Sequence, residues 1–188
     1  GLVGSEMCIR DRVEAFNRLG LPLVVVGDGP ERRRLEALAG STVTLLGRQS
    51  QEQVEALMSS CRAFVYAGLE DFGIAPVEAM AAGAPVIGLG RGGLLDTVRC
   101  ATTGLEQATG VLFPQQSVRS LVEAVSWFEQ KRIWRQLDAA AIRQWAERFR
   151  PEAFKARFEA TLRQAWTAHQ SRCAVAASDP AGMPALQL

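Results

Sequence analysis

The chain has 188 residues, of which 48% are hydrophobic and 22% are charged. This length is that of one ordinary domain with a hydrophobic core of its own. Its 21 basic and 20 acidic residues leave a formal net charge of +1, which excludes a polyelectrolyte partner and makes nucleic acid a poor substrate.

The opening residues, GLVGSEMCIRDR, differ from the rest of the chain. They lack the basic and apolar regions of a signal peptide and show no clear periodicity. The string resembles the translated sequencing-adapter remnants that occur at the ends of truncated metagenomic reading frames. We therefore expect residues 1–12 to be a non-native leader, residues 13–172 to form the native domain, and the chain to be a fragment.

Neither a membrane span nor a metal site is indicated by the sequence. No apolar run reaches the roughly 20 residues that a spanning helix needs. The cysteines are far apart and form no CxxC pair, which argues against a zinc site and a disulfide framework. They are Cys8, Cys61, Cys100 and Cys173. We expect reduced thiols, no metal and a cytoplasmic location.

Short apolar runs alternate with helical patterns along the chain. The runs predict strands at residues 23–27, 43–46, 63–66, 85–88 and 111–113. Apolar spacing predicts helices within residues 30–39 and 50–58, and another that carries residues 78–82 and stops at Gly83. This alternation favours right-handed βαβ crossovers. The predicted fold is α/β: a Rossmann-like parallel sheet with helices on both faces.

Helical patterns follow at residues 118–128, at residues 142–149 and after Pro151. On the last helix, apolar side chains recur at every fourth position: Phe154, Phe158, Leu162 and Trp166. We expect this stripe to pack on the sheet or on a missing second domain; the alternative is a membrane surface. Residues 173–188 are small, contain Pro and Gly and show no periodicity, so we expect a disordered tail.

Ligands of parallel α/β sheets bind beyond the carboxyl ends of the strands. Four loops lie there, and we expect them to converge: the GDGP turn, the Gly47 loop, the Glu70 loop and the glycine-rich Gly90 loop. In the GDGP turn, Gly27 and Gly29 are followed by Pro30 at a helix start. A dinucleotide fingerprint would need a third glycine where Arg32 stands, and an acidic residue after the second strand. The remaining G-x-G fits a tight turn as well as contact with a phosphate or a sugar, and both interpretations stay open.

Glu70 and Glu78 stand eight positions apart, on either side of Gly73. We expect Glu70 at the end of a strand and Glu78 in the first turns of the following helix, so that both face one crevice. A carboxylate accepts two hydroxyl hydrogen bonds, which suits the vicinal diols of ribose and hexose. The backbone N–H groups at the helix start, of Gly73, Ile74 and Ala75, would point toward a diphosphate. The alternative is that Glu78 only complements the helix dipole.

Three segments carry a family resemblance: VVVGDGPERRRLE, VTLLGRQSQEQVEALMSSCRAFVYAG and EDFGIAPVEAMAAGAPVIGLGRGG. Together they resemble the carboxy-terminal, donor-binding domain of the family 4 retaining glycosyltransferases of the GT-B fold, over residues 21–129. The last segment resembles the family's E-x7-E signature. The amino-acid sequences of the three segments are most similar to those of enzymes of polysaccharide and O-antigen assembly that use GDP-mannose.

The resemblance implies roles for the matching residues. The catalytic pair would be Glu78, which binds the ribose hydroxyls, and Glu70, which binds the donor hexose. Gly47 and Arg48 would meet the nucleobase, although Arg48 fits a solvated loop charge equally well. The remaining donor contacts would come from two loops: Gly27, Gly29 and Pro30 in one, and Phe72, Gly73, Ile74 and Ala75 in the other.

The resemblance also implies a mechanism and a missing part. Retaining transfer would pass through an oxocarbenium-like transition state, with no protein nucleophile, no metal and no cofactor besides the donor substrate. The family's phosphate-clamping Arg and Lys cannot be assigned here, and its amino-terminal acceptor domain is missing. We expect the fragment to bind the donor weakly without turnover. In the whole enzyme, a glycan or lipid-linked acceptor at the inner face of the membrane would receive the sugar.

Two other classes of protein remain as alternatives. A nucleotide-sugar sensor or an epimerase of the same architecture would share the donor contacts. A Rossmann oxidoreductase would need the intact glycine fingerprint that the GDGP turn lacks.

Overall fold

The structure is a computed structural model that describes residues 3–178, with side chains over residues 9–172. It divides into two compact units, Gly1–Glu147 and Arg148–Leu188. Part of the predicted tail, residues 179–188, lies outside the described residues.

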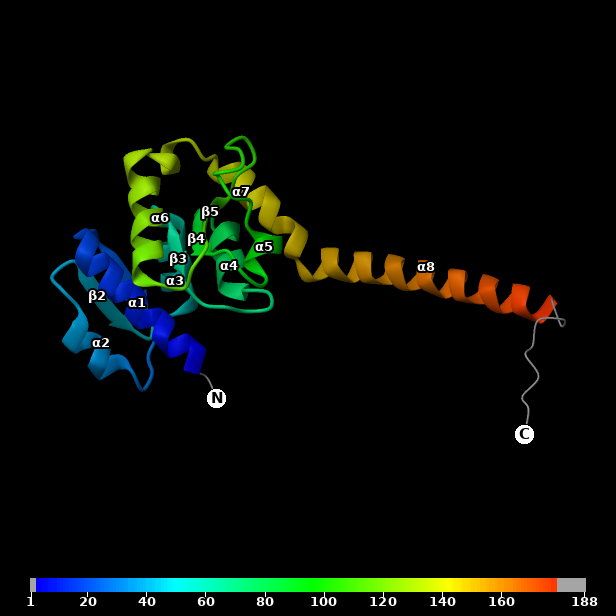
Figure 1. Cartoon of the computed structure of the whole chain (residues 1–188), viewed down its shortest axis with the longest axis horizontal. Coiled ribbons are helices and arrows are strands. Elements are labelled where there is room, and N and C mark those ends of the chain that lie inside the picture. The colour runs from blue at the N-terminus through cyan, green and yellow to red at the C-terminus, as the bar shows by residue number, and fades with distance from the viewer. Residues whose placement is uncertain (1–2, 179–188) are drawn as a thin grey trace. The chain divides into compact units, whose positions relative to one another are not determined.

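Strands and helices alternate through the first unit (Figure 1), as the apolar runs predict. The strands are β1 (Leu23–Val26), β2 (Val43–Gly47), β3 (Phe64–Tyr66), β4 (Val86–Leu89) and β5 (Gly110–Phe113). The helices of this unit are α1 (Val3–Leu19), α2 (Arg32–Leu38), α3 (Gln51–Ser60), α4 (Ile74–Ala81), α5 (Leu94–Thr97), α6 (Val118–Gln130) and α7 (Ala139–Ala146), with a 3₁₀ turn at Ile133–Arg135.

All strand pairs are parallel, and the strands form two sheets, β1-β2 and β3-β4-β5. The α/β class and the parallel pairing are therefore confirmed. Among the described residues, no hydrogen-bonded ladder joins β1 to β3, so the parallel strands are divided between these two sheets.

The free edge of β3 is covered by side chains. The N–H of Phe64 donates to the carbonyl of Pro85 beside β4 (2.8 Å), so Val65, the next residue, directs its peptide groups away from β4. The carbonyl of Val65 accepts a hydrogen bond from Arg12 (3.2 Å), and that of Ala67 accepts one from Gln116 (3.3 Å). Buried carbonyls need such partners wherever a neighbouring strand does not supply them.

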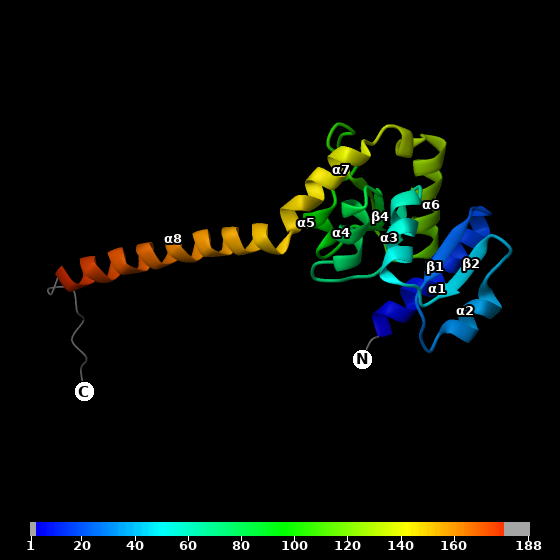
Figure 2. The same ribbon diagram turned by 180° about the vertical axis from the view of Figure 1, so that it is seen from behind.

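Alternate residues of β4 enter two separate cores. Ile87 and Leu89 belong to a core with Phe128 of α6, whereas Val86 belongs to a second core with Met80 of α4. Because successive side chains of a strand point to opposite faces, the sheet needs a helical cover on each side. Figures 1 and 2 show α6 and α4 on opposite sides of β4.

One element boundary corrects the expected placement of Glu70. β3 ends at Tyr66, so Glu70 lies in the loop after the strand and not at its end. α4 begins at Ile74, so Glu78 is its fifth residue and lies in the first turns of the helix, as expected. The chain leaves β3 early because residues 67–73 form a glycine-containing loop with no strand pairing.

Helix α1 runs across the boundary that was predicted after residue 12. The contact of Arg12 with β3 also lies at that boundary. That residues 1–12 are a foreign leader stays a prediction, because neither observation tests where these residues come from.

The second unit consists mainly of α8 (Pro151–Ser178). This helix continues past residue 173, where a disordered tail was expected to begin. Its apolar stripe is exposed: Phe154 61%, Phe158 57%, Leu162 57% and Trp166 61%. That the stripe packs on the sheet or on a missing second domain stays a prediction. Among the described residues, no helix is both long and apolar enough to cross a membrane.

Candidate functional site

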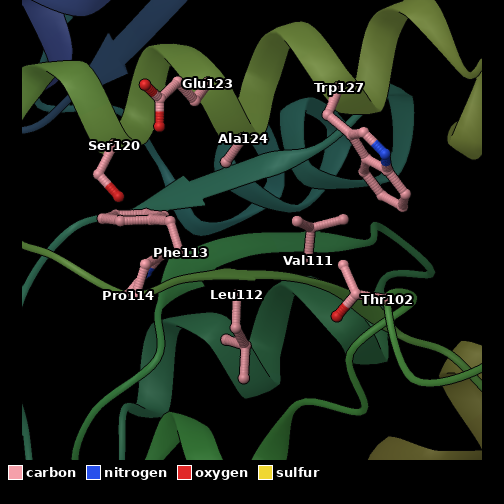
Figure 3. A pocket seen from close by; sticks show the side chains of 9 residues that line it. All are labelled: Thr102, Val111, Leu112, Phe113, Pro114, Ser120, Glu123, Ala124 and Trp127. Atoms are coloured by element: carbon pink, nitrogen blue, oxygen red, sulfur yellow. The ribbon is translucent and has the colours of Figure 1, made fainter.

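A cavity of about 170 Å³ lies between β5 and α6, where Thr102, Phe113, Glu123 and Trp127 are among the side chains that line it (Figure 3). None of the predicted donor-binding residues lines this cavity. Apart from Glu123, its side chains are uncharged, so it offers little to hold a diphosphate. The predicted site must be built from the loops beyond the strands.

Glu70 is held at both its side chain and its main chain. The hydroxyl of Tyr66, at the end of β3, donates a hydrogen bond to Oε1 of Glu70. The N–H of Gly93 donates to the carbonyl oxygen of Glu70 at 2.8 Å. The loop between β3 and α4 is thus tied to the loop between β4 and α5.

Glycines permit this contact between the two loops. A Cβ atom on Gly92 would lie 2.4 Å from the Glu70 carbonyl oxygen, and one on Gly93 would lie 2.4 Å from the carbonyl oxygen of Asp71. Both distances are below any real Cβ contact, so a side chain at either position would push the loops apart. The GRGG sequence is required here for close packing of backbones.

The start of α4 lies next to Glu70 in the chain. Gly73 precedes the helix with a left-handed backbone (φ 84°) and supplies no side-chain cap. The N–H groups of Ile74 and Ala75 belong to the first turn, where a helix has no internal acceptors for them. Ile74 is 66% exposed and Phe72 is 43% exposed, so this helix start faces solvent. That this helix start receives the diphosphate stays a prediction.

Glu78 lies on the exposed surface of α4. In the described part of the chain, its carboxylate has no hydrogen-bond or ion-pair partner. A free, solvated carboxylate can accept hydroxyl hydrogen bonds from a ligand without first breaking an internal contact.

The GDGP turn and the Gly47 loop meet at the ends of β1 and β2. The N–H of Gly27 donates to the carbonyl oxygen of Gly47 at 2.8 Å. Both glycines have positive φ angles, 123° and 70°, which other residues rarely adopt. Gly29 and Pro30 are exposed beside them. The sequence prediction that these residues come together is therefore met for this pair of strands.

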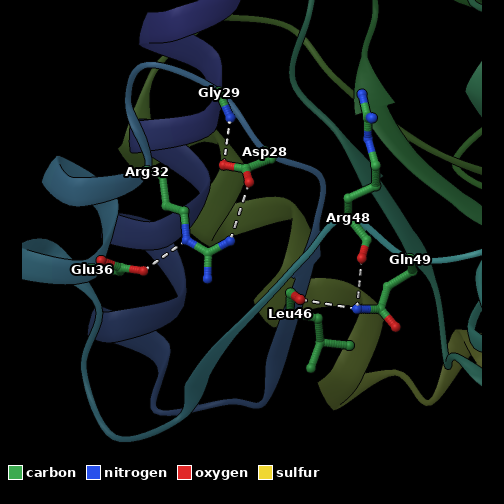
Figure 4. Close-up of polar contacts among 7 residues, drawn as sticks. All are labelled: Asp28, Gly29, Arg32, Glu36, Leu46, Arg48 and Gln49. Atoms are coloured by element: carbon green, nitrogen blue, oxygen red, sulfur yellow. Dashed lines mark hydrogen bonds and ion pairs between the residues drawn. The ribbon is translucent and has the colours of Figure 1, made fainter.

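Arg32 lies against Gly47 and is held by two carboxylates (Figure 4). Its Nε donates to Glu36 at 2.8 Å, and its Nη1 lies 3.5 Å from Asp28. The hydrogen bond to Glu36 and the charges of Asp28 and Glu36 raise the pKa of Arg32 above its ordinary value. A Cβ atom on Gly47 would lie 2.4 Å from Nη1, so Gly47 leaves room for the guanidinium group. The position of the third glycine in a dinucleotide fingerprint is thus occupied by Arg32, whose guanidinium group contacts the carboxylates of Glu36 and Asp28.

Arg48 is exposed and extends away from the Asp28–Arg32–Glu36 cluster, while the side chain of Gln49 donates to the carbonyl oxygens of Leu46 and Arg48 (Figure 4). This placement agrees with both earlier interpretations of Arg48, as a nucleobase contact and as a solvated loop charge.

The predicted residues therefore form two groups. Gly27, Gly29, Pro30, Gly47 and Arg48 gather at the ends of β1 and β2, and the residues from Glu70 to Glu78 gather around the start of α4. Among the described residues, no hydrogen bond or ion pair joins one group to the other. The described residues also contain no cluster of three or more His, Cys, Asp or Glu side chains that could hold a metal ion.

The sequence reasoning missed Tyr66. Tyr66 is the chain's single tyrosine and stands four positions before Glu70, which was an available signal. The glycine-rich loop after β4 was expected near the Glu70 loop, but the backbone contact of Gly92 and Gly93 with residues 70–72 was not predicted.

Residues 11–148 match the model of the family described as Glycosyl transferases group 1. The chain belongs to this family. Its α/β architecture with parallel strands is that of the GT-B glycosyltransferases among its structural neighbours, which are described below.

Curated relatives of the chain are named for the transfer of different sugars. It is 35% identical over 121 residues to a 2-deoxystreptamine glucosyltransferase of Streptomyces kanamyceticus, covering 58% of this chain and 31% of the relative. It is 32% identical over 106 residues to a GDP-mannose-dependent alpha-mannosyltransferase of Corynebacterium glutamicum, covering 56% and 25%. The chain thus spans about a third or less of these proteins.

Two solved structures resemble the chain. Sucrose-phosphate synthase from Thermosynechococcus elongatus has a TM-score of 0.69 at 28% identity, covering 87% of this chain and 43% of that one. Anabaena Alr3699/HepE in complex with UDP-glucose has a TM-score of 0.65 at 20% identity, and the match covers 82% of this chain and 44% of that one. At this lower identity the likeness shows the fold alone.

Proposed function

We propose that this chain is the donor-binding part of a retaining hexosyltransferase. Its donor is a nucleoside diphosphate sugar, with GDP-mannose as the first choice, and its acceptor is a glycan or a lipid-linked glycan. One observation carries the proposal: Glu70 is anchored beside the solvent-facing start of α4, and Glu78 is free on the same helix.

The chemistry of this arrangement matches the parts of such a donor. The first-turn N–H groups of Ile74 and Ala75 attract the diphosphate, because a helix start carries a partial positive charge. Glu78 accepts the ribose hydroxyls, and Glu70 accepts hydroxyls of the hexose. The Gly47 loop then contacts the base.

In the proposed reaction, the bond from the anomeric carbon to the diphosphate breaks and the acceptor oxygen forms a new bond on the same face of the sugar. The departing diphosphate takes the acceptor's proton. Stabilisation of its developing charge by the start of α4 lowers the barrier. The step needs no metal, no cofactor and no protein nucleophile.

The choice of donor rests on indirect support. The C. glutamicum relative is named for GDP-mannose. The amino-acid sequence around Glu70 also resembles that of enzymes that use this donor. The Anabaena structure contains UDP-glucose, so a UDP-sugar is the competing donor.

Calorimetric titration of the full chain with GDP, GDP-mannose, UDP and UDP-glucose tests the proposal. We expect saturable binding of one of the two nucleotides and of the nucleotide sugar that contains it. Glu78→Gln should weaken both about tenfold to a hundredfold, because hydrogen bonds from ribose to a charged acceptor are lost.

The matched control is Glu123→Gln, which changes an exposed glutamate that lines the cavity between β5 and α6. Its affinities should equal those of the unchanged chain. Loss of binding in Glu123→Gln but not in Glu78→Gln would place the ligand in the cavity. Binding of NAD without binding of any nucleotide sugar would favour the oxidoreductase alternative and overturn the proposal.

The whole protein's activity is part of the same proposal. A GT-B enzyme works between two domains, so we expect this chain to bind the donor without turnover, and a longer protein with an amino-terminal acceptor domain to transfer the sugar. We propose that it acts in the cytoplasm, at the inner face of the membrane where a lipid-linked acceptor is accessible. A longer protein that interconverts nucleotide sugars without any acceptor would instead be an epimerase.

A further inference from the structure

Tyr66 occupies a fixed position between the second core and the donor loop. It is the last residue of β3, and its ring packs partly buried against the core that contains Met80, Val86 and Leu94. The ring also stacks on Phe64, with ring centroids 6.4 Å apart and planes inclined by 14°. A ring held on these sides has little freedom to move.

Gly68 lets this ring lie against the loop that leads to Glu70. A Cβ atom on Gly68 would lie 3.0 Å from three atoms of the Tyr66 ring, including the hydroxyl oxygen. The ring therefore covers the backbone of residue 68, and its hydroxyl reaches Oε1 of Glu70, where it donates a hydrogen bond. Tyr66 thus connects a rigid strand to a side chain on an exposed loop.

We infer that Tyr66 is a positioning residue that holds the Glu70 carboxylate ready for the hexose of the donor. This inference rests on the proposed function. A carboxylate has two oxygen atoms, and the hydroxyl of Tyr66 occupies part of Oε1. Oε2 stays available for a hydroxyl of the hexose.

The gain from this hydrogen bond comes from lost mobility. Without Tyr66, the Glu70 side chain would sample several rotamers on an exposed loop and would have to be ordered by each sugar that binds. Ordering one such side chain weakens binding by about two- to tenfold. The effect should fall on the sugar alone, because Glu70 does not contact the nucleotide in this arrangement.

Tyr66→Phe removes the hydroxyl and keeps the ring. Calorimetry on the full chain measures the ratio of the dissociation constants for GDP and GDP-mannose, and for UDP and UDP-glucose. We expect Tyr66→Phe to lower the contribution of the sugar to affinity about two- to tenfold, with the affinity for the nucleotide unchanged. An unchanged ratio, or an equal loss for nucleotide and nucleotide sugar, would overturn the inference.

A double substitution separates positioning from direct contact. If Tyr66 acts through Glu70, then Tyr66→Phe should add no further loss to a chain that already carries Glu70→Ala, which removes the acceptor of the hydrogen bond. Additive losses would mean that the hydroxyl touches the sugar itself and would contradict the positioning role.

The single tyrosine also allows a test without any ligand. Tyrosine labelled with ¹³C at Cζ gives one resonance, which should shift in Glu70→Ala, where the acceptor is removed, and stay in place in Glu123→Gln. No shift in Glu70→Ala would show that the hydrogen bond is absent and would overturn the inference while leaving donor binding intact. If the unchanged chain binds no nucleotide at all, the proposed function fails and the inference fails with it.

Discussion

Gly93 lies where the loop after β4 meets the loop that carries Glu70. A Cβ atom there would lie 2.4 Å from both the Asp71 carbonyl oxygen and the Phe72 Cα. We expect Gly93→Ala to lower the free energy of unfolding by about 1–3 kcal/mol, because backbone atoms cannot move aside as a flexible side chain can. Urea denaturation followed by tryptophan fluorescence measures this change.

Gly29→Ala is the control for this prediction, since a Cβ atom on Gly29 would meet nothing within 4 Å. Its free energy of unfolding should stay within about 0.5 kcal/mol of the unchanged chain. If Gly93→Ala is equally neutral, the two loops are not packed as the structure places them.

At the scale of the helix, the side chain of Asn17 in α1 caps the C-terminal end of α2. Its Nδ2 donates to the carbonyl oxygen of Leu38, and its Oδ1 accepts from the N–H of Gly40, both at 2.8 Å. We expect Asn17→Ala to lower the free energy of unfolding by about 1–3 kcal/mol, because two hydrogen bonds are lost. Thermal and urea denaturation check this value.

Asn17→Asp is the comparison, because it keeps the acceptor for Gly40 but places a carboxylate oxygen against the carbonyl oxygen of Leu38 at the C-terminal end of α2. Its loss should be at least as large as that of Asn17→Ala. An Asn17→Ala chain as stable as the original would show that α2 does not depend on this contact.

Local signals predicted the elements well. The capping box of Ser50 and Gln53 is present at the start of α3, where the Ser50 side chain accepts from the Gln53 N–H and the Gln53 side chain accepts from the Ser50 N–H. Such contacts join residues three positions apart, so the sequence contains both partners. Asn17 was not predicted, because its partners lie more than 20 residues away.

At the scale of the whole molecule, the two units differ in how they bury their aromatic side chains. Phe128 in the first unit is 1% exposed, whereas Phe158 on α8 is 57% exposed. We expect Phe128→Ala to lower the free energy of unfolding by about 3–5 kcal/mol, because it leaves a cavity in the core. Phe158→Ala should change it by less than about 0.5 kcal/mol.

Urea denaturation of the two variants, followed by near-ultraviolet circular dichroism, compares the same substitution in the two settings. A loss in Phe158→Ala that approaches the loss in Phe128→Ala would mean that the stripe on α8 is packed against protein in solution. That result would favour the packing that the sequence pattern suggested.

The candidate site was predicted in part. Gly27 and Gly47 come together as expected, because parallel neighbouring strands end at the same edge of a sheet. The anchoring of Glu70 was not predicted, because it depends on Tyr66 lying against Gly68 and on the packing of Gly93 against another loop.

By itself, the sequence determined the α/β class, the order of strands and helices, and the placement of Glu78 on the helix after Gly73, since apolar spacing, caps and glycines act over a few residues. Only the tertiary structure decided that the strands form two sheets, that Glu70 stands in a loop beyond β3, and that the stripe on α8 is exposed. Those features depend on which groups, distant in the sequence, form hydrogen bonds with the free edge of each strand and which groups cover each apolar face. Spacing along one chain does not specify these partners.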